Sequence, residues 1–381
     1  MARQREFYKG RRKKRNYAII PAVILILVIS VVIVLFYSMQ KYAVISEDGI
    51  EIKLPILQED SDGTVIDASG NEVRVYEDAY AELSFLPADY SSVEASAGKN
   101  ATPVRAIFIP YEEVLDADKI EEYANRLSTG NALMFELKKE DGYLAWYSDS
   151  ATAFSYGLNM ASTDSKEFLT NQISQLKQED IYLVAQISAC IDGLFGSHCP
   201  SVTIKNQYGY DYGDAKGYYV DPYSPLVRNY IVELCSELYD MGFDEVVLSN
   251  VCCPIIDEDD DTELYFTGEM STTPTKVGAV SGFVVNVSDA LSERGTDKRL
   301  SAYVDTATAR VRADSSNGQD GPLFMKVFDR VYLNTDRYAY QYNCQDFESS
   351  VTIGDIYDRL VPVVINYLPD TTSWILIDSE E

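Results

Sequence analysis

From residue 104 onward, the sequence alternates short apolar runs, rich in β-branched residues, with segments of helical periodicity. Runs that are apolar throughout and are separated by crossover helices are typical of a parallel sheet covered by helices. Eight such runs within about 280 residues predict an α/β fold, a closed (β/α)8 barrel of the TIM type. The expected strands are residues 104–110, 132–137, 181–188, 245–251, 299–304, 330–334, 362–368 and 373–378.

The segments between these runs carry the signals of helix ends. Residues 116–127 begin among acidic residues, and residues 165–177 begin with Ser-Lys-Glu-Phe, the pattern of a capping box. Residues 224–241 and 277–294 each stop next to a glycine, which commonly ends a helix. A doubly wound sheet is the alternative fold. The barrel is favoured because the chain contains no G-x-G-x-x-G and no G-x-x-x-x-G-K-[ST] phosphate loop.

Charge divides the chain into two unequal parts. Residues 1–16 hold eight Lys and Arg and one Glu, a net charge of +7, whereas the whole chain has a net charge of -28. Residues 38–381 therefore carry 24 basic and 59 acidic residues, a net charge of -35. A polyanion of this size repels the phosphates of nucleic acids, so we expect no nucleic-acid partner.

Residues 17–37 contain no charged side chain and consist mainly of Ile, Val and Leu. As a helix this segment would be ~30 Å long, the thickness of the hydrocarbon core of a bilayer. The basic residues that precede it predict a cytoplasmic N-terminus and an extracellular C-terminal part. We predict an uncleaved signal-anchor with a single membrane span. A cleaved signal peptide is the alternative, but the apolar run exceeds the usual ~7–15 residues and no A-x-A-like site follows it.

The remaining chain divides into a stalk and the barrel. Residues 38–100 alternate β-like runs with turn residues, which predicts a small β-rich stalk, and residues 91–103 have the composition of a linker. The barrel domain is expected over residues 101–381. Cys190 and Cys199 are close enough in sequence to form a disulfide. Because His198 is the only histidine, no histidine-rich metal site exists, and we predict neither a metal nor a cofactor.

Carboxylates and amides follow several of the expected strands. In a (β/α)8 barrel, the carboxyl ends of the strands and the loops after them form the functional face. Glycoside hydrolysis needs only two carboxyl groups, ~5–5.5 Å apart in retaining enzymes and ~6.5–9.5 Å apart in inverting ones. Chance placement is the alternative explanation, because the chain contains 60 acidic residues.

Tyrosines cluster in the loops expected after the third and sixth strands, and aromatic rings stack on the apolar faces of sugars. Together with polar residues at the strand ends, these aromatic residues form the predicted substrate-binding surface. The candidates are Trp146, Asp192, Tyr219, Asp221, Tyr223, Asn250, Asn334, Asp336 and Tyr338.

The most specific pattern lies in residues 217–254, which contain V-D-P-Y-S-P at 220–225 and G-F-D-E at 242–245. This segment resembles the "putative glycosyl hydrolase domain" family of bacterial surface proteins, which are distant relatives of α-amylase-type barrels. The family shows V-D-P-Y-N-P before its fourth strand and G-F-D-E-I-x-F-D-Y on that strand. Weaker similarity covers most of residues 104–340. The resemblance implies a barrel of the glycosidase type.

The departures from the family pattern fall on the residues expected to perform the chemistry. They are Ser249 for the strand-four Asp, Asn250 for the Tyr after it, Cys252 for the Arg, Glu136 for the strand-two Asp and Gln186 for the strand-three Arg. Loss of a catalytic nucleophile typically lowers the rate by on the order of 10⁴-fold or more. Glu136 and Asp305 are the remaining candidates for the catalytic acid and base.

These patterns together predict a protein that is anchored in the cell membrane and acts on or binds a cell-envelope polysaccharide. The alternative is a catalytically inactive barrel that binds a glycan or a protein partner at the cell surface. A scaffold that recruits a partner through residues 1–16 is a third hypothesis, but a short basic tail more often contacts lipid and sets topology.

Overall fold

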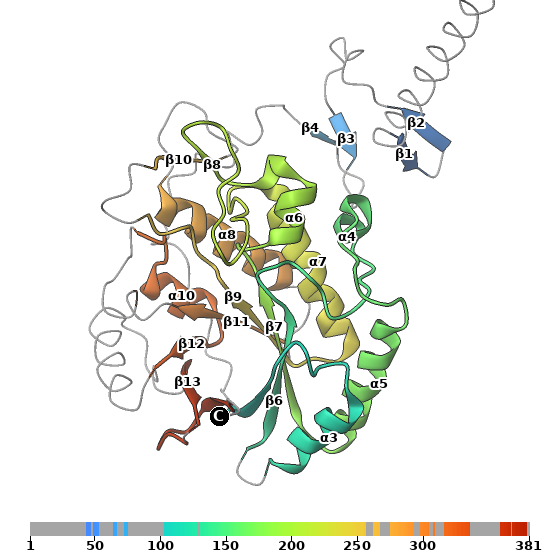
Figure 1. The fold of residues 1–381 in the computed structure, drawn as a ribbon, viewed down its shortest axis with the longest axis vertical. Helices are drawn as coiled ribbons and strands as arrows, with labels where there is room; N and C mark the ends of the chain where they lie inside the picture. The colour runs from blue at the N-terminus through green and yellow to red at the C-terminus, as the bar shows by residue number, and fades with distance from the viewer. Residues whose placement is uncertain are drawn as a thin grey trace, which may run out of the picture. The chain divides into compact units, whose positions relative to one another are not determined.

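The computed structural model describes most of the barrel and four short strands before it (Figure 1). The described residues are 103–127, 130–256, 262–266, 275–292, 298–304, 308, 316–335, 359–366 and 368–378, with the backbone of 43–46, 49–52, 64–66 and 72–74. The chain forms two compact units, Met1–Tyr76 and Glu77–Glu381. Residues 17–37, the predicted membrane span, lie outside the described residues. Within the described residues, no helix has the length and apolarity needed to cross a bilayer.

Two antiparallel hairpins make up the described part of the N-terminal unit. The first pairs β1 (Ala43–Ser46) with β2 (Gly49–Ile52), and the second pairs β3 (Thr64–Ile66) with β4 (Glu72–Arg74). Both hairpins fall in the segment with β-like runs. The role of this segment as a stalk stays a prediction.

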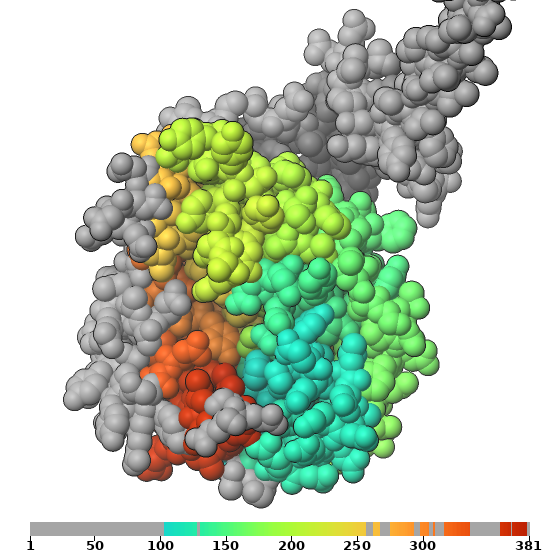
Figure 2. Space-filling model, viewed as in Figure 1, coloured from blue at the N-terminus to red at the C-terminus, as the bar shows by residue number. Residues whose placement is uncertain are grey.

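Eight parallel strands close into a barrel in the order in which they occur in the chain. The last strand pairs with the first, and Figure 2 shows the red C-terminal segment against the cyan segment that begins the barrel. The predicted (β/α)8 barrel is confirmed, and the doubly wound sheet is excluded. The strands are β5 (Arg105–Ile109), β6 (Ala132–Lys138), β7 (Tyr182–Ser188), β9 (Glu245–Ser249), β11 (Arg299–Val304), β12 (Val331–Asn334), β13 (Leu360–Ile365) and β14 (Trp374–Ile377).

Helices connect most of these strands and cover the outside of the barrel (Figure 1). Asp116 caps the first of them by accepting hydrogen bonds from two backbone N–H groups, and Gly242, with φ of 113°, ends the longest. The helices are α3 (Ala117–Asn125), α4 (Ala151–Tyr156), α5 (Ser165–Gln178), α6 (Gly193–His198), α7 (Pro225–Met241), α8 (Lys276–Leu291) and α10 (Gly321–Val327). A 3-10 turn, η2 (Pro200–Val202), and two short paired strands, β8 (Lys205–Asn206) and β10 (Leu264–Tyr265), lie in the loops.

The apolar residues form two cores because side chains alternate between the faces of each strand. The larger core fills the space between the strands and the helices. The smaller core lies inside the barrel and includes Met134, Val184, Val247 and Tyr332. Residues two positions further along each strand also point inward, so their side chains lie at the mouth of the barrel.

A buried ion pair lies among the residues that begin the strands. Glu245 and Arg330 are both fully buried and form a salt bridge. The Glu245 carboxylate also accepts hydrogen bonds from Tyr182 at 2.9 Å, Ser301 at 2.6 Å and Tyr332 at 2.8 Å. Because buried charges are costly unless they are paired and hydrogen-bonded, this network holds one end of the barrel interior together.

Two local predictions are wrong. The helix α5 has Asp164 at its N-cap, and the Ser165 hydroxyl donates instead to the backbone oxygen of Ser162, so residue 165 does not form a capping box. Cys190 and Cys199 are both buried free cysteines. They do not form the disulfide that their spacing in the sequence allowed.

Candidate functional site

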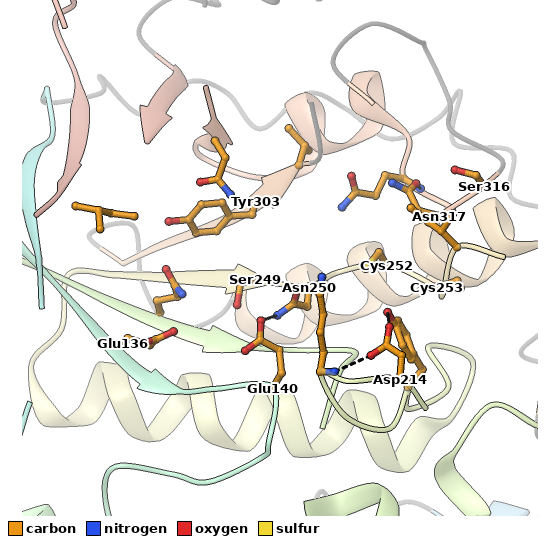
Figure 3. A pocket seen from close by; sticks show the side chains of 18 of the residues that line it. Glu136, Glu140, Asp214, Ser249, Asn250, Cys252, Cys253, Tyr303, Ser316 and Asn317 are labelled. Atoms are coloured by element: carbon orange, nitrogen blue, oxygen red, sulfur yellow. Dashed lines mark hydrogen bonds between the residues drawn. The ribbon is translucent and has the colours of Figure 1, made fainter. Parts of the chain in front are cut away.

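A cavity of 730 Å³ opens at the carboxyl ends of the barrel strands. Its lining combines residues from the strand ends with residues from the loops after β6, β7 and β9. Figure 3 shows Glu136, Ser249 and Tyr303 around one shared space, with Glu140 and Asn250 beside them. The functional face expected for a (β/α)8 barrel therefore contains a cavity in this chain.

Inward-pointing side chains at the strand ends form the floor of the cavity. Each lies two residues beyond another inward-pointing residue of its strand. Five of them carry polar groups, and Phe108 of β5 and Ile377 of β14 add apolar side chains to the same layer. The polar residues of the floor are Glu136 of β6, Gln186 of β7, Ser249 of β9, Tyr303 of β11 and Asn334 of β12.

Glu136 is the carboxyl group on this floor. Burial raises its pKa, and the negative charge of Glu140 adds to this effect, while the Tyr111 N–H, 3.3 Å from Oε2, and the Lys139 charge act in the opposite direction. Burial also raises the pKa of the Tyr303 hydroxyl, and the Glu136 charge contributes to that shift. A carboxyl group with a raised pKa keeps its proton to a higher pH, as a general acid requires.

One wall of the cavity is built around Asn250, which follows β9 and has φ of 53°. Asparagine tolerates this left-handed conformation better than most residues. Its side-chain Nδ2 donates to Glu140 Oε1 at 3.2 Å and to the Ser188 hydroxyl at 3.0 Å. These bonds orient the Glu140 carboxylate along the wall of the cavity (Figure 3).

The wall continues into the loop between β8 and α7, which lies beside Glu140. The Tyr219 hydroxyl donates to Asp214 Oδ2 at 2.9 Å, and the backbone N–H of Lys216 donates to Asp214 Oδ1 at 2.8 Å. Asp214, Lys216 and Tyr219 all line the cavity. Lys216 is the only cation among the described residues that line it.

Four of the predicted site residues line this cavity: Glu136, Tyr219, Asn250 and Asn334. Three others, Asp305, Asp336 and Tyr338, lie outside the described residues. The pairing of Glu136 with Asp305 as acid and base therefore stays a prediction.

The other predicted site residues occupy structural positions away from the cavity. Trp146 is completely buried in the outer core, so it offers no ring face to a ligand. Asp221 is also completely buried and accepts from the backbone N–H of Tyr223 at 2.8 Å. The Tyr223 ring packs against Phe266, with ring centres 5.2 Å apart, and its hydroxyl donates to the backbone oxygen of Thr275 at 3.3 Å.

Asp192 is displaced from the predicted surface by an irregularity in β6. The pairing of β6 with β7 shifts between Glu136 and Lys138, and this bulge turns Lys138 away from the barrel interior. The fully buried Lys138 ammonium then forms an ion pair with Asp192 at 2.9 Å, while Asp192 also caps α6 through the N–H of Phe195 at 2.7 Å. Both carboxylate oxygens of Asp192 are therefore used within the protein.

Sequence reasoning missed Glu140, Asp214, Lys216 and Tyr303 as site residues. Tyr303 was detectable, because alternation along the strand puts it on the same face as Ser301, two residues earlier. The other three lie in loops, where no periodic pattern indicates the direction of a side chain.

The fold and the cavity place this protein in the class of (β/α)8 barrels that have a polar cavity at the carboxyl ends of their strands. The family model described as "Putative glycosyl hydrolase domain" matches residues 106–334, which is more than half of the chain. The chain belongs to this family, as the resemblance at residues 217–254 indicated. No curated protein matches the chain in sequence.

The solved structures that resemble this chain have low sequence identity to it. A hypothetical protein from Ruminiclostridium thermocellum is 18% identical with a TM-score of 0.43, and the match covers 51% of this chain and 96% of that one. A family 36 α-galactosidase from Geobacillus stearothermophilus is 9% identical with a TM-score of 0.49, covering 79% of this chain and 42% of that one. A family 20 exo-β-N-acetylglucosaminidase from Vibrio harveyi is 13% identical with a TM-score of 0.42, and the match covers 69% of this chain and 41% of that one. This chain thus spans less than half the length of the two enzymes.

Proposed function

We propose that the barrel binds a cell-envelope polysaccharide in the cavity at its mouth, and that it does so without efficient hydrolysis. The floor of the cavity carries this proposal. It presents one carboxyl group, two amides and two hydroxyls, which suit the hydroxyl groups of a sugar, and Ser249 stands where the resemblance implies a catalytic carboxylate. The apolar rings and chains of Phe108, Ile255 and Ile377 also line the cavity and suit the apolar face of a sugar ring.

Hydrolysis of the glycan is the second candidate function, and Glu136 is the observation that favours it. Burial raises the pKa of this carboxyl group, as in residues that protonate a leaving group. An inverting or retaining reaction needs a second carboxyl group across the substrate. Among the described residues, Glu140 and Asp214 are the other carboxylates in the cavity, and both accept hydrogen bonds within its walls.

A binding experiment with pH as the variable tests the proposal. The full chain in detergent is titrated with cell-wall and capsular polysaccharides by calorimetry, and reducing ends are measured in parallel. A bound glycan displaces water from Glu136 and raises its pKa further, so the complex takes up protons. We therefore expect affinity to be highest below the raised pKa that Glu136 has in the free protein and to fall as the pH rises through it toward the still higher pKa in the complex.

Two variants make this test specific. Glu136→Gln is neutral at every pH, so its affinity is expected to lose this pH dependence, whereas Glu121→Gln, at an exposed position on α3, is expected to behave like the wild type. Absence of binding to every polysaccharide would overturn the proposal. Release of reducing ends that Glu136→Gln abolishes would replace it with the second candidate.

The membrane anchor and the extracellular position of the barrel are also part of the proposal. Their support is the basic segment 1–16 followed by the uncharged segment 17–37. A reporter enzyme that is active only outside the cytoplasm, fused after Glu381, is expected to be active in cells. Replacing the five basic residues at positions 11–15 with alanine is expected to lower that activity. An inactive reporter on a stable wild-type fusion would contradict this orientation.

A further inference from the structure

We propose that Gln186 determines which sugar the cavity accepts: its side-chain oxygen receives a hydrogen bond from a hydroxyl group of an uncharged sugar unit that lies on the floor beside Glu136. This inference rests on the proposed glycan binding. It adds a specificity-determining residue and the charge class of the ligand.

Gln186 is a buried polar side chain on the floor of the cavity. The residue is only 9% exposed, and its Oε1 atom is buried and accepts no hydrogen bond from any described residue. Polar atoms in this state are rare in folded proteins, because the lost hydrogen bonds to water are not replaced. Since Gln186 lines the cavity, a bound ligand can supply the missing donor.

Gln186 lies next to Glu136 on the cavity floor. The two residues are register partners on β6 and β7, and both point into the barrel. Neighbouring strands lie ~4.8 Å apart, so the carboxyl group and the amide present two adjacent polar groups at the same level of the floor. Neighbouring hydroxyl groups on one sugar ring match this arrangement, one at each side chain.

The charged groups of the cavity favour an uncharged ligand on the floor. The described floor residues include Glu136 and no Lys or Arg, and the single lining cation, Lys216, is an exposed residue of the loop before α7. A sugar carboxylate or phosphate on the floor would lose its water and would find no cation there to balance its charge. The floor therefore favours an uncharged sugar unit over a uronic acid or a sugar phosphate.

A binding role for Gln186 also predicts an unusual stability effect. An amide that only supported the fold would destabilise the protein when replaced. Because Oε1 has no partner among the described residues, Gln186→Leu, which has similar volume and no polar atoms, removes a buried unpaired group. We expect this variant to melt at the same temperature as the wild type or higher, while its binding is weakened.

The test uses the full chain in detergent and a set of trisaccharides as probes. Maltotriose, cellotriose, mannotriose, galactotriose and chitotriose are uncharged, and trigalacturonate is the acidic counterpart of galactotriose. We expect calorimetry to detect binding of at least one uncharged probe and none of trigalacturonate. Gln186→Leu is expected to weaken that binding by about 10-fold or more. Gln175→Leu, at an exposed position on α5, is the matched control and is expected to bind like the wild type.

The outcomes separate this inference from the proposed function. Unchanged binding by Gln186→Leu, or a preference for trigalacturonate, overturns the inference and leaves glycan binding standing. A fall in melting temperature that accompanies lost binding also overturns it, because Gln186 would then be structural. If the wild type binds neither these probes nor the envelope polysaccharides, the proposed function fails and the inference fails with it.

Discussion

Replacing Arg330 with Met is expected to lower the free energy of unfolding of the barrel by about 3–5 kcal/mol, because Glu245 then remains as a buried charge without its cation. Both side chains are fully buried inside the barrel. The hydrogen bonds from Tyr182, Ser301 and Tyr332 to Glu245 persist in this variant, but neutral donors do not compensate a buried carboxylate. The double variant Glu245→Leu with Arg330→Met is expected to recover most of the loss, since it removes both charges.

Urea unfolding followed by tryptophan fluorescence measures this effect. Both tryptophans of the chain, Trp146 and Trp374, are buried in the barrel unit, so the signal reports on that unit. The control is Arg126→Met, which removes a partly exposed ion pair with Asp378 and is expected to cost less than about 1 kcal/mol. A loss from Arg330→Met no larger than that of the control would show that the buried pair is not important for stability.

Ser249→Asp is expected to raise the hydrolysis of a bound glycan by about 10²-fold or more over the wild type, because it adds a second carboxyl group to the cavity floor. Ser249 on β9 and Glu136 on β6 both flank β7, so their backbones are ~10 Å apart. Both side chains line the cavity, which brings two carboxyl groups toward the separations that glycosidases use.

Reducing-end release from the glycan that the wild type binds is the measurement. The double variant Glu136→Gln with Ser249→Asp is expected to lose the gain, because no acid remains to protonate the leaving group. Ser174→Asp adds the same charge at an exposed position on α5 and is expected to have no effect. If Ser249→Asp releases no more reducing ends than Ser174→Asp, adding one carboxylate is not sufficient for hydrolysis, and the cavity lacks other catalytic groups as well.

The strands of the barrel were predictable because each is buried on both faces. A run such as residues 181–188 must be apolar almost throughout, and the observed strand β7 spans Tyr182–Ser188. The ends of helices were less predictable, since Ser165 has the sequence of a cap and uses its hydroxyl in the preceding loop. A capping pattern indicates which hydrogen bonds are available, and the neighbouring loop decides which of them form.

Most of the site residues that were predicted correctly lie on a strand or directly after one, and Tyr219, from a cluster of tyrosines in a loop, is the exception. Glu136, Asn250 and Asn334 lie on strands or directly after them, and they line the cavity as expected. Asp192 and Asp221 follow strands or precede helices in the same way, yet both are buried in internal contacts. A single bulge in β6 turns Lys138 toward Asp192, and no residue pattern announces that bulge.

The architecture follows from the residue pattern, because eight doubly buried strands with crossover helices close into one kind of barrel and the alternation of their side chains follows directly. Which polar groups remain available to a ligand depends on the tertiary structure. That outcome depends on pairings between distant segments, such as Asn250 with Glu140 and Lys138 with Asp192. In the folded barrel, Gln186 is buried at the cavity floor, and no described residue donates a hydrogen bond to its Oε1 atom.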